Sequence, residues 1–132
     1  MKRQNTAILF YNQNGEVLLQ LRDNNPEISW PNHWGCLGGA VEEGESVEDC
    51  LKREIQEEIE YNLVEYESLG VLGLSEDRGY HMFIGRLDKE VSEITLHEGQ
   101  EIRFFDPKQA LELPLTNGAR ELVQRYIEKI NI

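Results

Sequence analysis

The stretch from Gly38 to Tyr61, GGAVEEGESVEDCLKREIQEEIEY, constrains the fold of this chain more than any other. It opens with a glycine pair, passes through a further glycine turn at Gly44 and continues as a helix. At about 100° per residue, Glu54, Glu57 and Glu58 share one face of that helix. Like charges at this spacing weaken an isolated helix, so a hard divalent cation bound through oxygen ligands is the natural candidate to offset them.

The start and the buried face of this helix can also be predicted. Ser46 is a natural N-cap, and Glu48 and Asp49 complement the positive end of the helix dipole. Apolar residues recur at helical spacing and define the core face: Val47, Cys50, Leu51, Ile55 and Ile59. The carboxylate face therefore borders the buried stripe, which a merely solvated charged face would not be expected to do.

The composition indicates one globular domain, residues 1–132. The apolar fraction is 39%, which suits a packed core and argues against disorder. No apolar run approaches the roughly 20 residues that span a bilayer, and the N-terminal run AILFY is too short for a secretory signal. We therefore expect a cytoplasmic protein with no membrane partner.

The charge balance narrows the class of ligand. With 25 acidic and 13 basic residues the net charge is −12, which weighs against a nucleic-acid polymer as partner. A small phosphorylated ligand stays open, because a bound metal inverts the sign of a local acidic site. Cys36 and Cys50 lack the spacing of a zinc or redox motif and are expected to be buried free thiols.

The rest of the chain reads as strands interleaved with helices. We predict strands at Thr6–Tyr11, Glu16–Arg22, Leu63–Leu74 with a kink at Gly70, Tyr80–Leu87 and Glu101–Asp106, and helices at Lys108–Leu111 and Asn117–Ile130. Asn12–Gly15 is a hairpin turn, Asp23–Asn32 a loop, and Arg78 and Gly79 lie in a turn. Trp30 and Trp34 are expected to cover the core edge, with base stacking by Trp30 as the alternative.

The stretch from Gly39 to Glu58 resembles the Nudix box, the signature of the Nudix hydrolase superfamily. That pattern is Gly, five residues, Glu, seven residues, then Arg-Glu-aliphatic-x-Glu-Glu-x-Gly-aliphatic. In this chain Gly39, Glu45 and the run Arg53-Glu54-Ile55-Gln56-Glu57-Glu58 match every position up to Glu58. So many fixed residues in a suitable strand–loop–helix context make a chance match remote.

The box departs from the pattern at its end. The family's glycine after the glutamate pair is Glu60 in this chain, and the aliphatic position after it is Tyr61. Because that glycine ends the helix in the family pattern, its loss is expected either to lengthen the helix or to place a strained residue there. The proline that usually precedes the two glycines is Leu37.

The resemblance implies an α/β/α sandwich, with a mixed sheet between the box helix and the C-terminal helix. It also implies hydrolysis of a nucleoside diphosphate linked to another moiety, by attack of water on phosphorus with Mg²⁺ or Mn²⁺. By analogy the metal ligands are Gly38 (its carbonyl), Glu57 and Glu58, with Glu54 as a further ligand or the proton acceptor. Arg53 would orient a carboxylate through a bidentate pair, and Glu45 would support the joint between loop and helix.

Members of this superfamily tend to supply one more carboxylate from outside the box. Glu98 and Glu101 are both candidates, and Glu98 is preferred because a loop can be aimed at a site built elsewhere. Arg22, Arg78 and Arg86 are candidate contacts for substrate phosphates, and each is equally well explained as a strand-end charge. The resemblance also implies a monomer or a homodimer, and it leaves base and leaving group to loops such as Asp23–Asn32 and Ser75–Gly79.

Three other functions are alternatives to a pyrophosphohydrolase. The main alternative is a catalytically inactive Nudix-like module that senses a nucleotide, although such relatives would be expected to lose box carboxylates that this chain keeps. An isoprenoid diphosphate isomerase is disfavoured. Such relatives typically carry extra metal-binding histidines and cysteines, whereas this chain has three scattered histidines. An acidic α/β domain with no site is disfavoured by the specificity of the motif.

Overall fold

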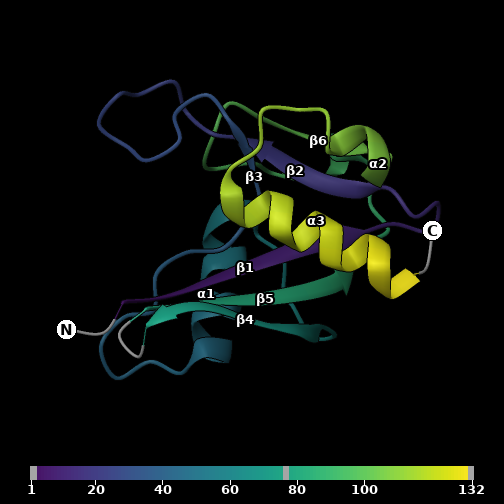
Figure 1. The fold of residues 1–132 in the computed structure, drawn as a ribbon. Coiled ribbons are helices and arrows are strands. Elements are labelled where there is room, and N and C mark those ends of the chain that lie inside the picture. The colour runs from purple at the N-terminus through teal and green to yellow at the C-terminus, as the bar shows by residue number, and fades with distance from the viewer. Residues whose placement is uncertain (1–2, 76–77, 131–132) are drawn as a thin grey trace.

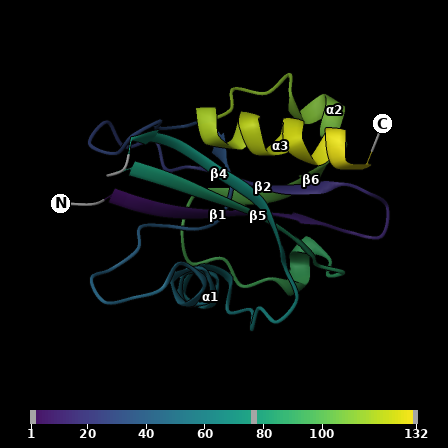
Figure 2. The same ribbon diagram turned by 60° about the horizontal axis from the view of Figure 1, so that its bottom comes forward.

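One mixed β-sheet lies between helices on its two faces (Figure 1; Figure 2). The computed structural model describes residues 3–75 and 78–130. The strands are β1 (Arg3–Tyr11), β2 (Val17–Leu21), β3 (Trp34–Gly35), β4 (Glu67–Ser75), β5 (Arg78–Arg86) and β6 (Glu101–Phe105). The helices are α1 (Val47–Ile59), α2 (Pro107–Ala110) and α3 (Asn117–Ile130), with a 3₁₀ turn η1 (Val91–Glu93). The expected α/β/α sandwich is confirmed.

The sheet runs in the order β3-β2-β1-β5-β4, and β6 pairs with the free side of β2. β1 and β5 are parallel along their whole length, whereas the other pairs are antiparallel. The predicted hairpin joins β1 to β2, and the Asn12 side chain accepts backbone N–H bonds from Asn14 and Glu16. Such an Asx turn fixes the register of the two strands.

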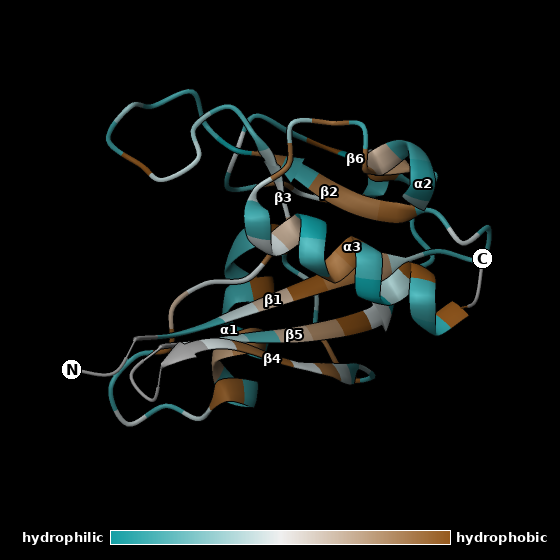
Figure 3. Ribbon diagram, in the orientation of Figure 1, coloured by the Kyte–Doolittle hydropathy of each residue, from teal (hydrophilic) through white to brown (hydrophobic). Residues whose placement is uncertain are grey.

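Alternation along the strands divides the core into two layers. In β1, Ile8 and Phe10 face α1, whereas Ala7 and Leu9 face α3, because successive side chains of a strand point to opposite sides. Each helix covers its layer with an apolar stripe: Leu51, Ile55 and Ile59 from α1, and Leu122, Val123 and Tyr126 from α3. Figure 3 shows hydrophobic colour concentrated through the middle of the sheet. Ile130, at the end of α3, is 39% exposed.

Helix α1 begins and ends where the box pattern indicates. Ser46 is the N-cap, and its side chain accepts a hydrogen bond from the Asp49 N–H at 3.0 Å. The helix is not lengthened by the missing glycine, because Glu60 takes the left-handed conformation (φ 52°, ψ 39°) and ends it. Of the two outcomes expected for this position, the strained residue is the one found.

Several predicted strand boundaries were wrong; β1, for example, begins at Arg3 rather than Thr6, because it pairs with β5 along its whole length. β4 begins at Glu67 rather than Leu63, because Leu63 is buried in the α1 layer, where the chain crosses from the helix to the sheet edge. β5 begins at Arg78, so Arg78 and Gly79 are strand residues, since β1 and β4 pair with them from both sides. β6 ends at Phe105, and Asp106 caps α2 instead. The kink at Gly70 is confirmed as a register shift in β4 at a positive φ.

The two cysteines are free, as expected; Cys50 is buried, whereas Cys36 is only partly buried. Loss of contact with water raises the pKa of the Cys36 thiol to about 12, so this sulfur is protonated at neutral pH. None of the helices in the described ranges combines the length and the apolar character needed to cross a membrane.

Candidate functional site

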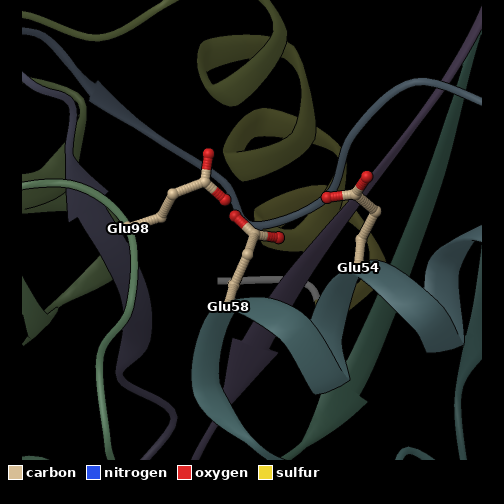
Figure 4. A group of neighbouring side chains, drawn as sticks. All are labelled: Glu54, Glu58 and Glu98. Atoms are coloured by element: carbon tan, nitrogen blue, oxygen red, sulfur yellow. The ribbon is translucent and has the colours of Figure 1, made fainter.

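Three glutamates converge at one end of helix α1 (Figure 4). Glu54 and Glu58 lie one helical turn apart on α1, and Glu98 comes from the loop before β6. One carboxylate oxygen from each of the three lies within 4.8 Å of the other two. Glu58 is 3% exposed, Glu54 is half-buried and Glu98 is exposed, so the cluster forms a cup that opens to solvent on the Glu98 side.

The glycine pair shapes the floor of this cup. Residues 37–41 run antiparallel to β1, and Gly38 takes φ +140°. A Cβ on Gly38 would lie 2.2 Å from the Thr6 carbonyl oxygen, so only glycine fits. In this position the Gly38 N–H donates to Glu58 Oε1 at 2.9 Å. A Cβ on Gly39 would lie 2.4 Å from the Glu54 carboxyl carbon, so the second glycine makes room for that carboxylate.

Arg53 organises the other side of the cluster. Its Nε donates to Glu45 Oε2 at 2.7 Å and its Nη2 to Glu45 Oε1 at 3.0 Å, which is the bidentate pair expected of an arginine. Its Nη1 donates to Glu54 Oε1 at 3.0 Å and to Glu57 Oε1 at 3.1 Å. The two bonds from Arg53 to Glu45, and then a bond from the Glu42 N–H, lower the pKa of Glu45 to about 2. The Arg53–Glu45 pair also joins the loop before α1 to the helix.

The predicted site residues do not all meet. The structure brings together Glu54, Glu58 and Glu98 beside Gly38. Glu57 lies outside this group, and its side chain, 56% exposed, pairs with Arg53. Its role as a metal ligand stays a prediction. The other candidate from outside the box, Glu101, pairs with Arg103 on β6.

Burial and mutual repulsion decide the protonation of the cluster. Removal from water, and then the charge of Glu98, raise the pKa of Glu58 from 4.5 to about 9. Burial also raises the pKa of Glu54, although Arg53 opposes that shift. The cluster therefore holds a proton at neutral pH, and a cation that takes the proton's place would remove the repulsion. Carboxylate and carbonyl oxygens are the donors that Mg²⁺ and Mn²⁺ prefer, so the residues present fit such an ion.

The loop that carries Glu98 is fastened by residues that sequence reasoning missed. The Gln20 side chain, buried on β2, donates to the Glu98 carbonyl at 2.7 Å. On the other side, the His97 N–H donates to the Glu58 carbonyl at 2.8 Å. The only available signal for Gln20 was a polar residue inside an apolar strand, which does not by itself indicate its partner.

A cavity of about 400 Å³ adjoins the cluster. Gly38 and Gly39 line one wall, and the remaining lining includes Arg22, Trp30, Cys36, Leu72, Tyr80 and Thr116. Gly39 lies against the Glu54 carboxylate as well as against the cavity, so this one residue stands between the cavity and the cup. Arg22 also borders a smaller cavity that reaches Glu98.

Two tryptophans behave differently from each other. Trp34 is 8% exposed and packs edge-on against Phe105, as predicted for the core edge. Trp30 is 41% exposed and lines the cavity, so the prediction that it covers the core edge was wrong. The reason lies in the loop: Trp30 takes a positive φ of 52° and contacts His33 rather than the core.

Of the predicted phosphate contacts whose side chains the structure describes, Arg22 lies near the cup and Arg86 does not. The Arg22 Nε donates to the Ser29 carbonyl at 2.9 Å. Arg86 pairs with Asp88. The Arg78 side chain and residues 76–77 of the predicted specificity loop lie outside the described part of the chain.

Comparison with protein families decides the relationship. The family model of the NUDIX domain matches residues 1–126. The chain belongs to the Nudix hydrolase superfamily. This Nudix chain carries the acidic cluster where the box helix of the family lies, and divalent metal ions are typical of that family.

Several Nudix proteins are similar to this chain. A Nudix hydrolase of Listeria innocua, lin0387, is 28% identical over 116 residues, covering 84% of this chain and 67% of its own length. The nucleoside triphosphatase NudI of Escherichia fergusonii is 38% identical over 62 residues, covering 47% of this chain. That match spans 44% of NudI, less than half of its length.

The fold is shared with a solved structure. The MutT protein of Methanosarcina mazei Go1 superposes with a TM-score of 0.81 at 21% identity, covering 98% of this chain and 95% of that one. At this identity the similarity concerns the fold alone.

The raised pKa of Glu58 predicts proton release on metal binding. At pH 7 the metal-free Glu58 carboxyl is protonated, since its pKa is about 9. Binding of Mn²⁺ should therefore release about one proton per ion, and affinity should rise roughly tenfold per pH unit up to that pKa. Calorimetry in two buffers of different ionisation enthalpy measures the proton number. If the number of protons released per ion is near zero at pH 7 and is the same in Glu58→Gln, Glu58 is not protonated in the metal-free protein and the prediction is contradicted.

Proposed function

We propose that this Nudix domain, residues 1–132, is a metal-dependent pyrophosphohydrolase. It would cleave the pyrophosphate bond of a nucleoside diphosphate linked to another moiety, by attack of water on phosphorus. The observation that carries the proposal is the convergence of Glu54, Glu58 and Glu98 within 4.8 Å, next to a cavity of about 400 Å³. A cavity of that size suits a small molecule, which matches the expectation of a nucleotide rather than a polymer.

The cluster residues would hold the metal. Glu54, Glu58 and Glu98, with the Gly38 carbonyl and Glu57 as the further ligands expected from the box, would bind Mg²⁺ or Mn²⁺. When bound, the ion would supply neutralisation of phosphate charge and a water of lowered pKa. The raised pKa of Glu54 suits it to accept a proton from the attacking water.

The remaining residues would orient the reactants. Arg53 holds Glu54 at 3.0 Å and so fixes the direction of its carboxylate. The nucleoside would occupy the cavity, with the exposed Trp30 ring as a surface on which a base can stack. Arg22 lies where it can meet a phosphate between the cavity and the cup.

Nucleoside triphosphates are the first substrates to test, because the relative NudI is named a nucleoside triphosphatase. The other candidates are oxidised purine nucleotides, nucleotide sugars and ADP-ribose. We expect a monomer or a homodimer in the cytoplasm.

An activity screen of the purified protein tests the proposal. Each nucleotide class is incubated with Mg²⁺, with Mn²⁺ and with a chelator, and the products are separated by chromatography. The expected result is metal-dependent release of phosphate, pyrophosphate or a nucleoside monophosphate, which the chelator abolishes. Glu57→Gln should reduce this turnover by orders of magnitude if Glu57 joins the metal site, and unchanged turnover would remove it from the site. Tight nucleotide binding without hydrolysis of any class would instead support the sensor module.

A further inference from the structure

The residue that departs from the Nudix pattern, Glu60, makes a contact beside the cluster. Its backbone takes the left-handed conformation, in which a residue with a Cβ is strained and glycine is not. Such strain persists where surrounding contacts over-determine the residue. Its side chain carries one such contact, because Glu60 Oε2 pairs with His97 Nε2.

His97 directly precedes Glu98, and it is held to the helix at two points. Its imidazole meets the Glu60 carboxylate, and its N–H donates to the Glu58 carbonyl at 2.8 Å. The second bond satisfies one of the carbonyls left open at the end of α1. The helix end that carries Glu58 is therefore tied to the loop residue that precedes Glu98.

The far side of Glu98 is also fixed. Gln20 donates to the Glu98 carbonyl at 2.7 Å, and the Gln100 N–H donates to the Leu21 carbonyl at 2.8 Å. Gly99 turns the chain between them at φ +85°. With β2 holding one side, the Glu60–His97 contact and the bond from the His97 N–H to the Glu58 carbonyl together hold the other side of this short loop.

The contact contributes more to position than to stability. Both side chains are about half exposed, at 50% for His97 and 51% for Glu60, and exposed pairs of this kind add little to folding. One oxygen of the Glu98 carboxylate, by contrast, lies within 4.8 Å of oxygens of Glu54 and Glu58, and the charge of Glu54 repels it. A mobile loop would let this exposed carboxylate move away from the cluster, so a fixed backbone keeps it within reach.

We propose that Glu60 and His97 are positioning residues that hold the Glu98 carboxylate in the cluster before metal binds. The inference rests on the proposed metal site, in which Glu98 is a ligand. A neutral imidazole can donate to the carboxylate as a charged one does, so the contact does not depend on the charge of His97. Glu60 thereby helps to hold the loop that carries Glu98. A glycine at this position, as in the family pattern, has no side chain that could contact His97.

A thermodynamic cycle on Mn²⁺ binding tests this inference without any nucleotide. The dissociation constant is measured by electron paramagnetic resonance for wild type, Glu60→Gly, Glu98→Gln and the double variant. Glu60→Gly should weaken Mn²⁺ binding about tenfold, the size typical of losing an outer partner of a metal ligand. It should have no further effect in the Glu98→Gln background, because the group that it positions is gone.

Conservative variants separate positioning from general damage. Glu60→Gln keeps an oxygen that accepts from His97 and should bind Mn²⁺ within about twofold of wild type. His97→Ala should weaken Mn²⁺ binding as much as Glu60→Gly does. If Glu60→Gly fails to fold, His97→Ala takes its place in the thermodynamic cycle. Unchanged Mn²⁺ affinity in Glu60→Gly, or an equal loss in the Glu98→Gln background, would overturn the inference. An unaltered affinity in Glu98→Gln alone would also overturn it, while hydrolysis in the nucleotide screen would still support the proposed reaction.

Discussion

Glu58→Gln should reduce metal-dependent turnover by more than about 100-fold, a loss larger than that of an outer-shell partner. The amide keeps the shape of the side chain, and its oxygen can still accept the Gly38 N–H that Glu58 binds at 2.9 Å. What it removes is the negative charge that Glu58 gains when a metal ion displaces its proton, at the most deeply buried point of the cluster, where the side chain is 3% exposed. Steady-state kinetics with the preferred nucleotide measures the effect.

The same substitution should stabilise the metal-free protein. A carboxyl whose pKa rises from 4.5 in the unfolded chain to about 9 in the folded one opposes folding increasingly as the pH rises between those values. At pH 7 this opposition is on the order of 3 kcal/mol. Glu58→Gln should therefore raise the melting temperature in a chelator by roughly 5 °C or more.

Glu101→Gln is the matched control for this experiment. Glu101 is a nearby acidic residue that pairs with Arg103 instead of the cluster. Its substitution should leave turnover within about twofold and leave the melting temperature nearly unchanged. A loss of turnover in Glu101→Gln as large as that in Glu58→Gln would mean that the cluster has been assigned to the wrong carboxylates.

Arg53→Lys should lower turnover by about 10- to 100-fold even though the charge is kept. Arg53 bonds to Glu45 through two nitrogens and to Glu54 and Glu57 through a third. A lysine ammonium is a single point that cannot reproduce this fork, so Glu54 loses its fixed direction. The pKa of Glu45, held at about 2 by these bonds, should rise, and the variant should unfold at a higher pH than wild type on acidification.

Arg125→Lys gives the comparison. The side chain of Arg125 on α3 is 31% exposed, close to the 25% of Arg53. It pairs with Glu121 and donates to the Leu69 carbonyl. Its replacement should cost some stability and leave turnover unchanged, because it lies outside the cluster. Equal losses of turnover in the two variants would show that Arg53 acts through stability alone.

Much of the framework was predictable because its signals are local. The Ser46 cap, the apolar stripe of α1 and the bounds of α3 (Asn117–Ile130) follow from helical spacing and capping chemistry, which depend on neighbours in sequence. The beginnings of β4 and β5 were wrong for the opposite reason. They depend on which strands lie alongside, and the pairing of Arg78 with Arg3 joins residues far apart in the chain.

The candidate site also combines features that local sequence signals predict with features that depend on long-range contacts. Spacing places Glu54 and Glu58 on one helical face, and a loop position favours Glu98. Whether Glu57 turns toward the cluster or toward Arg53 depends on side-chain contacts that periodicity does not contain. The bonds from Gln20 to the Glu98 carbonyl and from the His97 N–H to the Glu58 carbonyl join residues far apart in the chain, and no local pattern indicates them.

Titration of the metal-free protein with Mn²⁺, followed by electron paramagnetic resonance, tests the central claim most directly. The cluster of Glu54, Glu58 and Glu98 predicts a saturable site in the wild type, weakened more than about 100-fold in Glu58→Gln and unaffected in Glu101→Gln. Equal Mn²⁺ binding by the wild type and Glu58→Gln would contradict the assignment of these carboxylates as a metal centre.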